Sequence, residues 1–173
     1  MHFLLGDIGG TNARFALASD RQLGTIEHAM AADHLKVGDA IAAFLARQKG
    51  AHALTAAVLA VAGPIAGERC IITNSHWIID AAELRKAFGF SHVRLINDFA
   101  AVALSLPHLA ATDLFPLGGG KAVTGEPMVV LGPGTGFGAA ALLHRDGRAI
   151  PIATEGGHNT LAAGSRHEDA IIE

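Results

Sequence analysis

Cysteine, tryptophan and long apolar runs are scarce in this 173-residue chain, and each scarcity narrows the possibilities. The single cysteine, Cys70, excludes an intramolecular disulfide and any metal cage built from cysteines. No apolar run approaches the length that crosses a bilayer, so we expect no membrane partner. The N-terminus lacks the basic segment that opens a signal peptide. Together these absences indicate a reducing, cytoplasmic location.

Positive charge is also sparse. The chain has 13 Lys and Arg against 16 Asp and Glu, a formal net charge of −3, and its basic residues are scattered. A nucleic-acid partner normally requires a basic face, so we expect none. Hydrophobic residues make up 50% of the chain, which is enough for a sizeable core.

Two glycine-rich turns carry most of the chemical information. The first is Gly6–Thr11, and the second spans 132–138 with the sequence GPGTGFG. Each lies between strand-like apolar runs. Glycine permits a positive φ and lets an anion approach the backbone N–H groups closely. The two turns together predict a pair of phosphate clamps, although the second taken alone also fits an ordinary hairpin loop. Neither is a Walker A loop or a Rossmann fingerprint.

Asp7 stands at the end of the first buried strand, directly before the first glycine turn. A carboxylate at this position would repel bound phosphates unless a divalent cation lay between them. We therefore predict that Asp7 holds Mg²⁺, directly or through water, because Mg²⁺ uses few carboxylates and keeps several waters. The alternative is a turn aspartate that bonds its own backbone two residues on.

Asn97 and Asp98 follow a short buried strand and precede a predicted helix. Open α/β sheets bind their ligands at this edge. We predict that Asp98 is a general base that takes a proton from a hydroxyl, while Asn97 orients the same substrate. The alternative is that Asp98 only caps the helix.

Glu155 and His158 flank a Gly-Gly pair. A carboxylate and a neutral imidazole together suit a polyol, because the first accepts from hydroxyls and the second both donates and accepts. A Ser/His/Asp hydrolase is a rival interpretation, but the Gly-x-Ser-x-Gly elbow is missing. A metal site is another, but a Glu-x-x-His pair without a further carboxylate is a thin ligand set.

The apolar patterns and turn signals predict an α/β chain with one complete domain and the opening of a second. A Gly-, Pro- and Thr-rich connection at 107–127 separates them. The expected strands are 2–8, 13–18, 22–28, 55–61, 69–73, 93–96, 128–131, 139–144 and 149–152. The expected helices are 37–48, one from Asp80 to Gly89, 99–106 and one that begins at 165.

The motifs closely resemble the bacterial glucokinase family, in order along essentially the whole chain. The matching segments are 5–17, 96–101, 131–138 and 155–158, and 73–77 is similar to a family segment near the sugar site. The family belongs to the sugar kinase/actin/heat-shock ATPase superfamily. The resemblance implies an actin-like (ribonuclease H-like) domain of mixed sheet flanked by helices over 1–108. It also implies the beginning of a larger second domain of the same superfamily over 109–173.

The resemblance further implies a glucokinase reaction with ATP and Mg²⁺, in which Asp98 is the base at the 6-hydroxyl of glucose. The implied glucose ligands are Asn97, Asp98, Glu155 and His158. The implied phosphate-binding residues are Gly6, Asp7, Ile8, Gly9, Gly10, Thr11, Gly134, Thr135 and Gly136.

Family members are nearly twice as long, so we expect this chain to be an incomplete portion of the enzyme. A second copy covering exposed apolar surface makes a homodimer a candidate. A non-catalytic sugar-binding or regulatory module and a kinase for another hexose remain alternatives.

Overall fold

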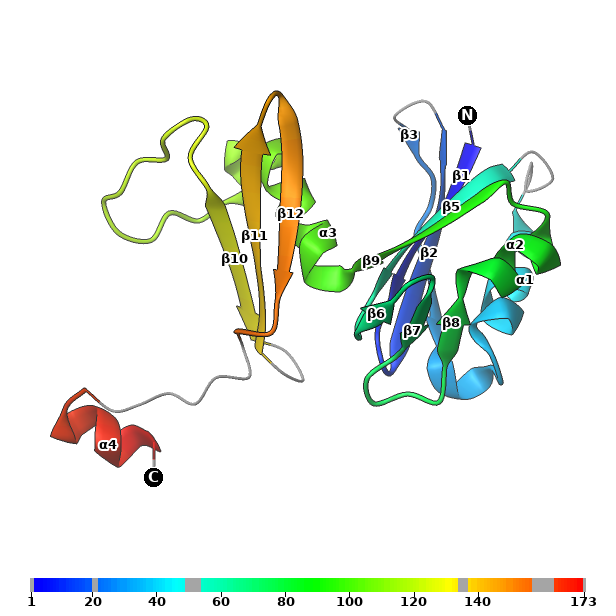
Figure 1. The fold of residues 1–173 in the computed structure, drawn as a ribbon, viewed down its shortest axis with the longest axis horizontal. Coiled ribbons are helices and arrows are strands. Elements are labelled where there is room, and N and C mark those ends of the chain that lie inside the picture. The colour runs from blue at the N-terminus through cyan, green and yellow to red at the C-terminus, as the bar shows by residue number, and fades with distance from the viewer. Residues whose placement is uncertain (1, 20–21, 49–53, 134–136, 157–163, 173) are drawn as a thin grey trace. The chain divides into compact units, whose positions relative to one another are not determined.

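The computed structural model describes residues 2–19, 22–48, 54–133, 137–156 and 164–172 (Figure 1). Its contacts divide the chain into two compact units, Met1–Ala101 and Val102–Glu173. The predicted domain boundary after residue 108 stays a prediction. The two units are described separately below.

A mixed sheet forms the centre of the first unit, with strand order β3-β2-β1-β5-β9 and β4 pairing with β2. Its strands are β1 (His2–Ile8), β2 (Asn12–Ser19), β3 (Gln22–Leu23), β4 (Glu27–Met30), β5 (Leu54–Val61) and β9 (His92–Asn97). The β1 and β2 strands are antiparallel, whereas β5 runs parallel to both β1 and β9. The near-continuous apolar run of β5 is typical of a strand buried in a parallel arrangement.

The predicted strand 22–28 is wrong, because the structure has two short strands there. The β3 strand pairs with the end of β2 and β4 pairs with its beginning. Gly24 interrupts the run, and its N–H donates to the Leu17 carbonyl at 2.8 Å. Glycine weakens strand continuity, since it lacks a side chain to pack against neighbours.

The core of the first unit lies between the sheet and helix α1 (Val37–Arg47). Leu4 and Ile8 of β1 are fully buried, as is Ile41 of the helix. The ring centroids of Phe15 and Phe44 are 5.7 Å apart, within the range of favourable aromatic pairs. The core therefore fixes β1 and β2 on either side of the first glycine turn.

Helix α2 (Ala81–Phe88) begins and ends where the sequence predicts. The Asp80 carboxylate accepts from the N–H groups of Ala82 and Glu83 at 2.9 and 3.2 Å. Gly89 ends the helix in the left-handed conformation, with φ of 69°. Both signals are local, so sequence alone is enough to find them.

A second small sheet precedes α2. Its strands are β6 (Ile65–Ala66), β7 (Arg69–Ile71) and β8 (Ile78–Asp80), of which only β7 was predicted. The loop between β7 and β8 ends at Trp77, which is 1% exposed. The indole Nε1 of Trp77 donates to the His34 carbonyl at 3.0 Å. This bond ties the loop to the segment before α1.

Helix α3 (Asp98–Ser105) follows β9 directly, and a 3₁₀ turn over Leu106–His108 follows the helix. The second unit holds an antiparallel sheet of β10 (Met128–Pro133), β11 (Phe137–Arg145) and β12 (Arg148–Thr154). Asp146 and Gly147 form the β11–β12 turn with φ of 51° and 71°. Helix α4 (Arg166–Ile172) is the last element. Among the described residues, no helix is long and apolar enough to span a membrane.

Candidate active site

The candidate site in the first unit lies at the carboxyl ends of its parallel strands. Ile8 of β1 pairs with Val61 of β5, and Val61 pairs with Asn97 of β9. The first glycine turn follows β1, and α3 follows β9. The turn and the Asn97–Asp98 pair are therefore two strand spacings apart, or about 10 Å. The fold brings together two of the motifs predicted from sequence.

The first glycine turn is closed by its own backbone and packed against a second loop. The Gly9 N–H donates to the Asn12 carbonyl at 2.9 Å. A Cβ on Gly10 would lie 2.6 Å from the Thr73 carbonyl oxygen, too close for any other residue. Gly6, in contrast, lies inside β1, where a Cβ would meet the Leu59 side chain at 2.7 Å. Packing within the sheet thus accounts for Gly6.

Asp7 is held by Arg14, its direct partner across the β1–β2 ladder. An Arg14 guanidinium nitrogen lies 2.7 Å from Asp7 Oδ2, and both side chains are about half exposed, at 54% and 50%. The turn alternative for Asp7 predicted a bond to the N–H of Gly9, but that N–H binds the Asn12 carbonyl. Our sequence reasoning missed Arg14. Counting pairs outward from the turn would have placed it opposite Asp7.

The donor set around Asp7 suits a cation that is bound mainly by other groups. One carboxylate is present, and the described residues contain no group of three or more His, Cys, Asp or Glu that could hold a metal ion. Mg²⁺ is commonly held by one or two carboxylates together with waters and substrate phosphates. Asp7 beside the glycine turn fits that pattern.

The helix cap falls on Asn97 and not on Asp98, for which capping was the alternative interpretation. The Asn97 Oδ1 accepts from the Ala100 N–H at 3.0 Å, so Asn97 caps α3. This bond uses its carbonyl oxygen and leaves its amide NH₂ as the donor for a ligand. The Asp98 Oδ1 accepts from the Phe99 N–H at 2.8 Å, which places the carboxylate at the positive end of the helix dipole.

The Cys70 thiol lies within electrostatic range of the Asp98 carboxylate. Burial chiefly raises the pKa of the Cys70 thiol, and the negative charge of Asp98 raises it further. A buried thiol with a raised pKa is a poor nucleophile. We assign Cys70 a packing role beside the candidate site.

In the second unit, Glu155 is exposed and directly follows β12. The neighbouring Thr154 hydroxyl donates to the Ala139 carbonyl at 3.0 Å and accepts from the Gly156 N–H at 3.3 Å. These bonds fix the backbone on both sides of Glu155. The remaining predicted residues lie outside the described part of the chain: Gly134, Thr135, Gly136 and His158.

The model of the glucokinase family matches residues 4–173. The chain belongs to the glucokinase family. It is 43% identical over 172 residues to the glucokinase of Paramagnetospirillum magneticum and 38% identical over 170 residues to that of Nitrobacter hamburgensis. These matches cover 98% of this chain but 54% and 53% of the two relatives. The chain therefore spans about half the length of the curated relatives that it matches.

Solved glucokinase structures have the same fold. The glucokinase from an Antarctic psychrotroph matches with a TM-score of 0.84 and 35% identity, over 97% of this chain and 54% of that one. The Balamuthia mandrillaris glucokinase, solved in complex with glucose, matches with a TM-score of 0.73 and 25% identity, over 98% and 53%. The actin-like α/β fold predicted from the motifs is confirmed.

Proposed function

We propose that this chain forms the substrate- and phosphate-binding half of a glucokinase that transfers the γ-phosphoryl group of ATP to the 6-hydroxyl of glucose. The observation that carries the proposal is the meeting of the first glycine turn with Asn97 and Asp98 at one sheet edge. Phosphoryl transfer requires phosphate donors and a base near the nucleophile in one place. We also propose that the protein is located in the cytoplasm.

The first glycine turn would hold the nucleotide phosphates through its backbone N–H groups and the Thr11 hydroxyl. Asp7 would hold Mg²⁺ through water, because Arg14 already occupies its Oδ2 at 2.7 Å. When bound, Mg²⁺ neutralises charge on the phosphates. Arg14 keeps the Asp7 carboxylate in one orientation. Gly134, Thr135 and Gly136 are proposed to form the second clamp.

Asp98 would accept the proton of the glucose 6-hydroxyl as that oxygen attacks the γ-phosphorus. The bond from phosphorus to the bridging oxygen breaks, and ADP leaves with the electron pair. The Asn97 amide donates to a sugar oxygen, since its own carbonyl is committed to the Ala100 N–H. Glu155 and His158 are proposed to bind further sugar hydroxyls.

We propose as the alternative a non-catalytic hexose-binding or regulatory module, which keeps Asn97, Asp98 and Glu155 as sugar ligands. A kinase for another hexose, such as mannose, would use the same kinds of polar side chain. Calorimetric titration of this chain with glucose, and separately with MgATP, separates the two candidates, because the module binds sugar without nucleotide whereas the kinase half binds both.

The test of the proposed base is Asp98→Asn. The chain is first completed with the C-terminal half of the Paramagnetospirillum magneticum glucokinase, and sugar phosphate formation is measured. We expect the substitution to lower kcat by about 10² to 10⁴, the usual contribution of a general base, while glucose still binds. Cys70→Ala, which removes a neighbouring side chain without chemistry, is the matched control. Undiminished turnover in Asp98→Asn would contradict the assignment.

A further inference from the structure

The ion pair between Asp7 and Arg14 differs from the other close ion pairs of the first unit. Arg47 joins α1 to β4, and Arg85 joins α2 to the turn before β7. Each of those pairs links elements that are not neighbours in a sheet. Asp7 and Arg14, in contrast, lie on two strands that a ladder of seven residue pairs already holds together. The ion pair is therefore not needed to join its two strands.

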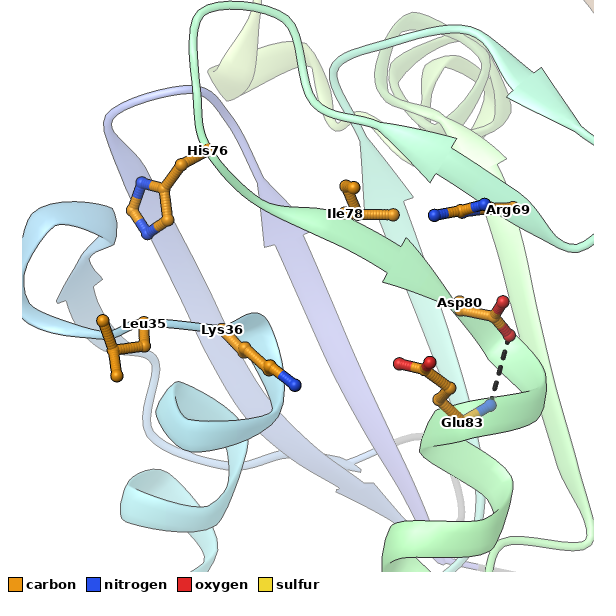
Figure 2. A pocket seen from close by; sticks show the side chains of 7 residues that line it. All are labelled: Leu35, Lys36, Arg69, His76, Ile78, Asp80 and Glu83. Atoms are coloured by element: carbon orange, nitrogen blue, oxygen red, sulfur yellow. Dashed lines mark hydrogen bonds between the residues drawn. The ribbon is translucent and has the colours of Figure 1, made fainter.

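A pocket of about 380 Å³ in the first unit also contains charged side chains, but their charges are balanced. It lies between the segment before α1 and the β7–β8 hairpin, and Lys36 and Arg69 are matched there by Asp80 and Glu83. Figure 2 shows Lys36 and Glu83 pointing toward one another. The pocket therefore has no net charge that would attract an ion. The Asp7–Arg14 pair instead lies beside a turn that is suited to bind anions.

Asp7 and Arg14 form the first side-chain pair next to the glycine turn on the outer face of the sheet. The pair closest to the turn is Ile8 with Ala13, and both of these residues are 0% exposed in the core. Successive side chains of a strand alternate between its two faces. Asp7 and Arg14 therefore lie on the face opposite the core, and Gly9 of the turn is two positions beyond Asp7.

The Asp7 carboxylate has one oxygen held and one oxygen left. Its neighbour in β5 is Ala60, whose methyl group offers no hydrogen bond, so Arg14 is the one charged residue directly opposite Asp7 in the two ladders of β1. The Arg14 Nη1 donates to Asp7 Oδ2 at 2.7 Å. Within the described part of the chain, Asp7 Oδ1 accepts no hydrogen bond.

We propose that Arg14 is a positioning residue for Mg²⁺-dependent phosphate binding at the first glycine turn. This inference rests on the proposed function. Arg14 holds Oδ2 and so leaves Oδ1 of Asp7 as the acceptor for a water bound to the cation. Residues that orient a metal ligand commonly change metal affinity by about 10- to 100-fold. Because the Asp7–Arg14 pair is half exposed and screened by water, we expect an effect of about fivefold.

The test is a titration of the ¹⁵N-labelled 173-residue chain with ATP, followed by NMR shifts of the backbone N–H groups of 9–11. Each variant is titrated with Mg²⁺ and with EDTA in its place, in about 0.3 M KCl to screen surface charges. The quantity compared is the Mg²⁺ ratio, the Kd without Mg²⁺ divided by the Kd with Mg²⁺. We expect Arg14→Gln to lower this ratio about fivefold.

The Mg²⁺ ratio separates positioning from the other roles that Arg14 could have. If Arg14 only stabilised the turn, Arg14→Gln would weaken both titrations equally and leave the ratio unchanged. If Arg14 attracted the phosphates by its charge, the more negative metal-free ATP would lose more affinity, and the ratio would rise. Either result would overturn the proposal. Arg14→Lys keeps a donor for Oδ2, so its ratio should lie between those of the wild type and Arg14→Gln.

Asp7→Asn connects this test to the proposed function. A positioning residue acts through Asp7, so the ratio of the double variant should lie within about twofold of that of Asp7→Asn alone. A further loss in the double variant would overturn the positioning role. If Asp7→Asn does not lower the ratio, or if ATP shifts no N–H of 9–11 in the wild type, the proposed phosphate site itself is wrong. If Asp7→Asn lowers the ratio and Arg14→Gln does not, only the role of Arg14 is wrong.

Arg94→Gln is the matched control. Arg94 of β9 is exposed and belongs to the row of Leu5, two residues before Asp7 on the same face of the sheet. The variant removes the same charge from that face at a greater distance from the turn, so its Mg²⁺ ratio should equal that of the wild type. An equal loss in Arg94→Gln would mean that the charge of the sheet face, and not the bond to Asp7, sets the ratio.

Discussion

At the scale of single residues, backbone crowding shapes the phosphate turn as much as its chemistry does. The Gly9 N–H donates to the Asn12 carbonyl, and Gly10 lies against the backbone carbonyl of Thr73. Asn74, the next residue of that loop, has a φ of 58°, a conformation that costs energy in residues other than glycine. The loop 73–77 therefore packs against the first glycine turn.

Gly10→Ala should destabilise the protein by about 1–3 kcal/mol, because the new Cβ would lie 2.6 Å from a backbone oxygen that cannot move freely. Gly38→Ala is the matched control. It lies in α1, where a Cβ meets nothing within 4 Å, and should stabilise by up to about 1 kcal/mol. Urea unfolding followed by circular dichroism measures both. Equal stability of the two variants would rule out the crowding at Gly10.

The same scale shows where sequence reasoning succeeds. The positions of Asp7 and Asp98 beside strand ends were predicted correctly, because a strand end is a feature of a local sequence window, while their chemical roles stay predictions. Identifying Arg14 as the partner of Asp7 required the register of the β1–β2 hairpin. The contact of Gly10 with Thr73 joins residues far apart in the chain. The capping alternative named Asp98, whereas the structure caps α3 with Asn97, because a one-residue shift of a helix start is invisible in the sequence.

At the scale of elements, helices and strands with strong local sequence signals could be predicted. Very short elements could not. Helix α2 carries both a capping aspartate and a terminal glycine, and its bounds were predicted. The β6 and β8 strands are two and three residues long, too short for an alternating pattern. Their pairing depends on the β7 strand between them. The pairing of this small sheet was therefore not predictable from sequence.

An ion pair joins this small sheet to α2 and gives a pH-dependent prediction. Arg85 binds both carboxylate oxygens of Glu68, at 2.8 and 2.7 Å. The hydrogen bond from Arg85 lowers the pKa of Glu68 from its usual 4.5. Because the folded-state pKa is the lower one, the pair stabilises the protein above about pH 4.5. That contribution disappears as the pH falls through the folded-state pKa.

Arg85→Gln should therefore lower Tm near pH 7 and have a shrinking effect as the pH falls through the acid range. Differential scanning calorimetry between pH 3 and pH 7 measures the difference from wild type. Lys86→Gln removes the same charge from the same helix, but Lys86 has no carboxylate partner within the described residues. It should show no such convergence. A constant Tm difference for Arg85→Gln at every pH would contradict the linkage.

At the scale of the whole molecule, the two units differ in how well they bury their apolar residues. The first unit has a core that includes Leu4, Ile8, Ile41 and Trp77, each at most 1% exposed. In the sheet of the second unit, one face buries Ala140 and Leu142. The other face carries the large apolar side chains of β10 and β12. They are Val129, Leu131, Ile150 and Ile152, which are 65%, 61%, 42% and 42% exposed.

This exposed face predicts self-association of the 173-residue chain. Val129 pairs with Ala141, and Ala141 pairs with Ile152, so the three share one face of the sheet. Contiguous apolar surface of this kind favours association, and β10 and β12 are the outer strands of this sheet among the described residues. We expect sedimentation velocity to show a weight-average mass that rises with concentration. The homodimer predicted from the sequence is the simplest product.

Val129→Thr combined with Ile152→Thr should weaken this association about tenfold or more, because two apolar side chains that association would bury become polar. Val123→Thr is the matched control, since Val123 is also 65% exposed but lies outside the strands. It should associate like the unaltered chain. If the unaltered chain remains monomeric at every concentration, the exposed face does not drive association. If Val123→Thr weakens association equally, the contact is general rather than a property of the β10–β12 face.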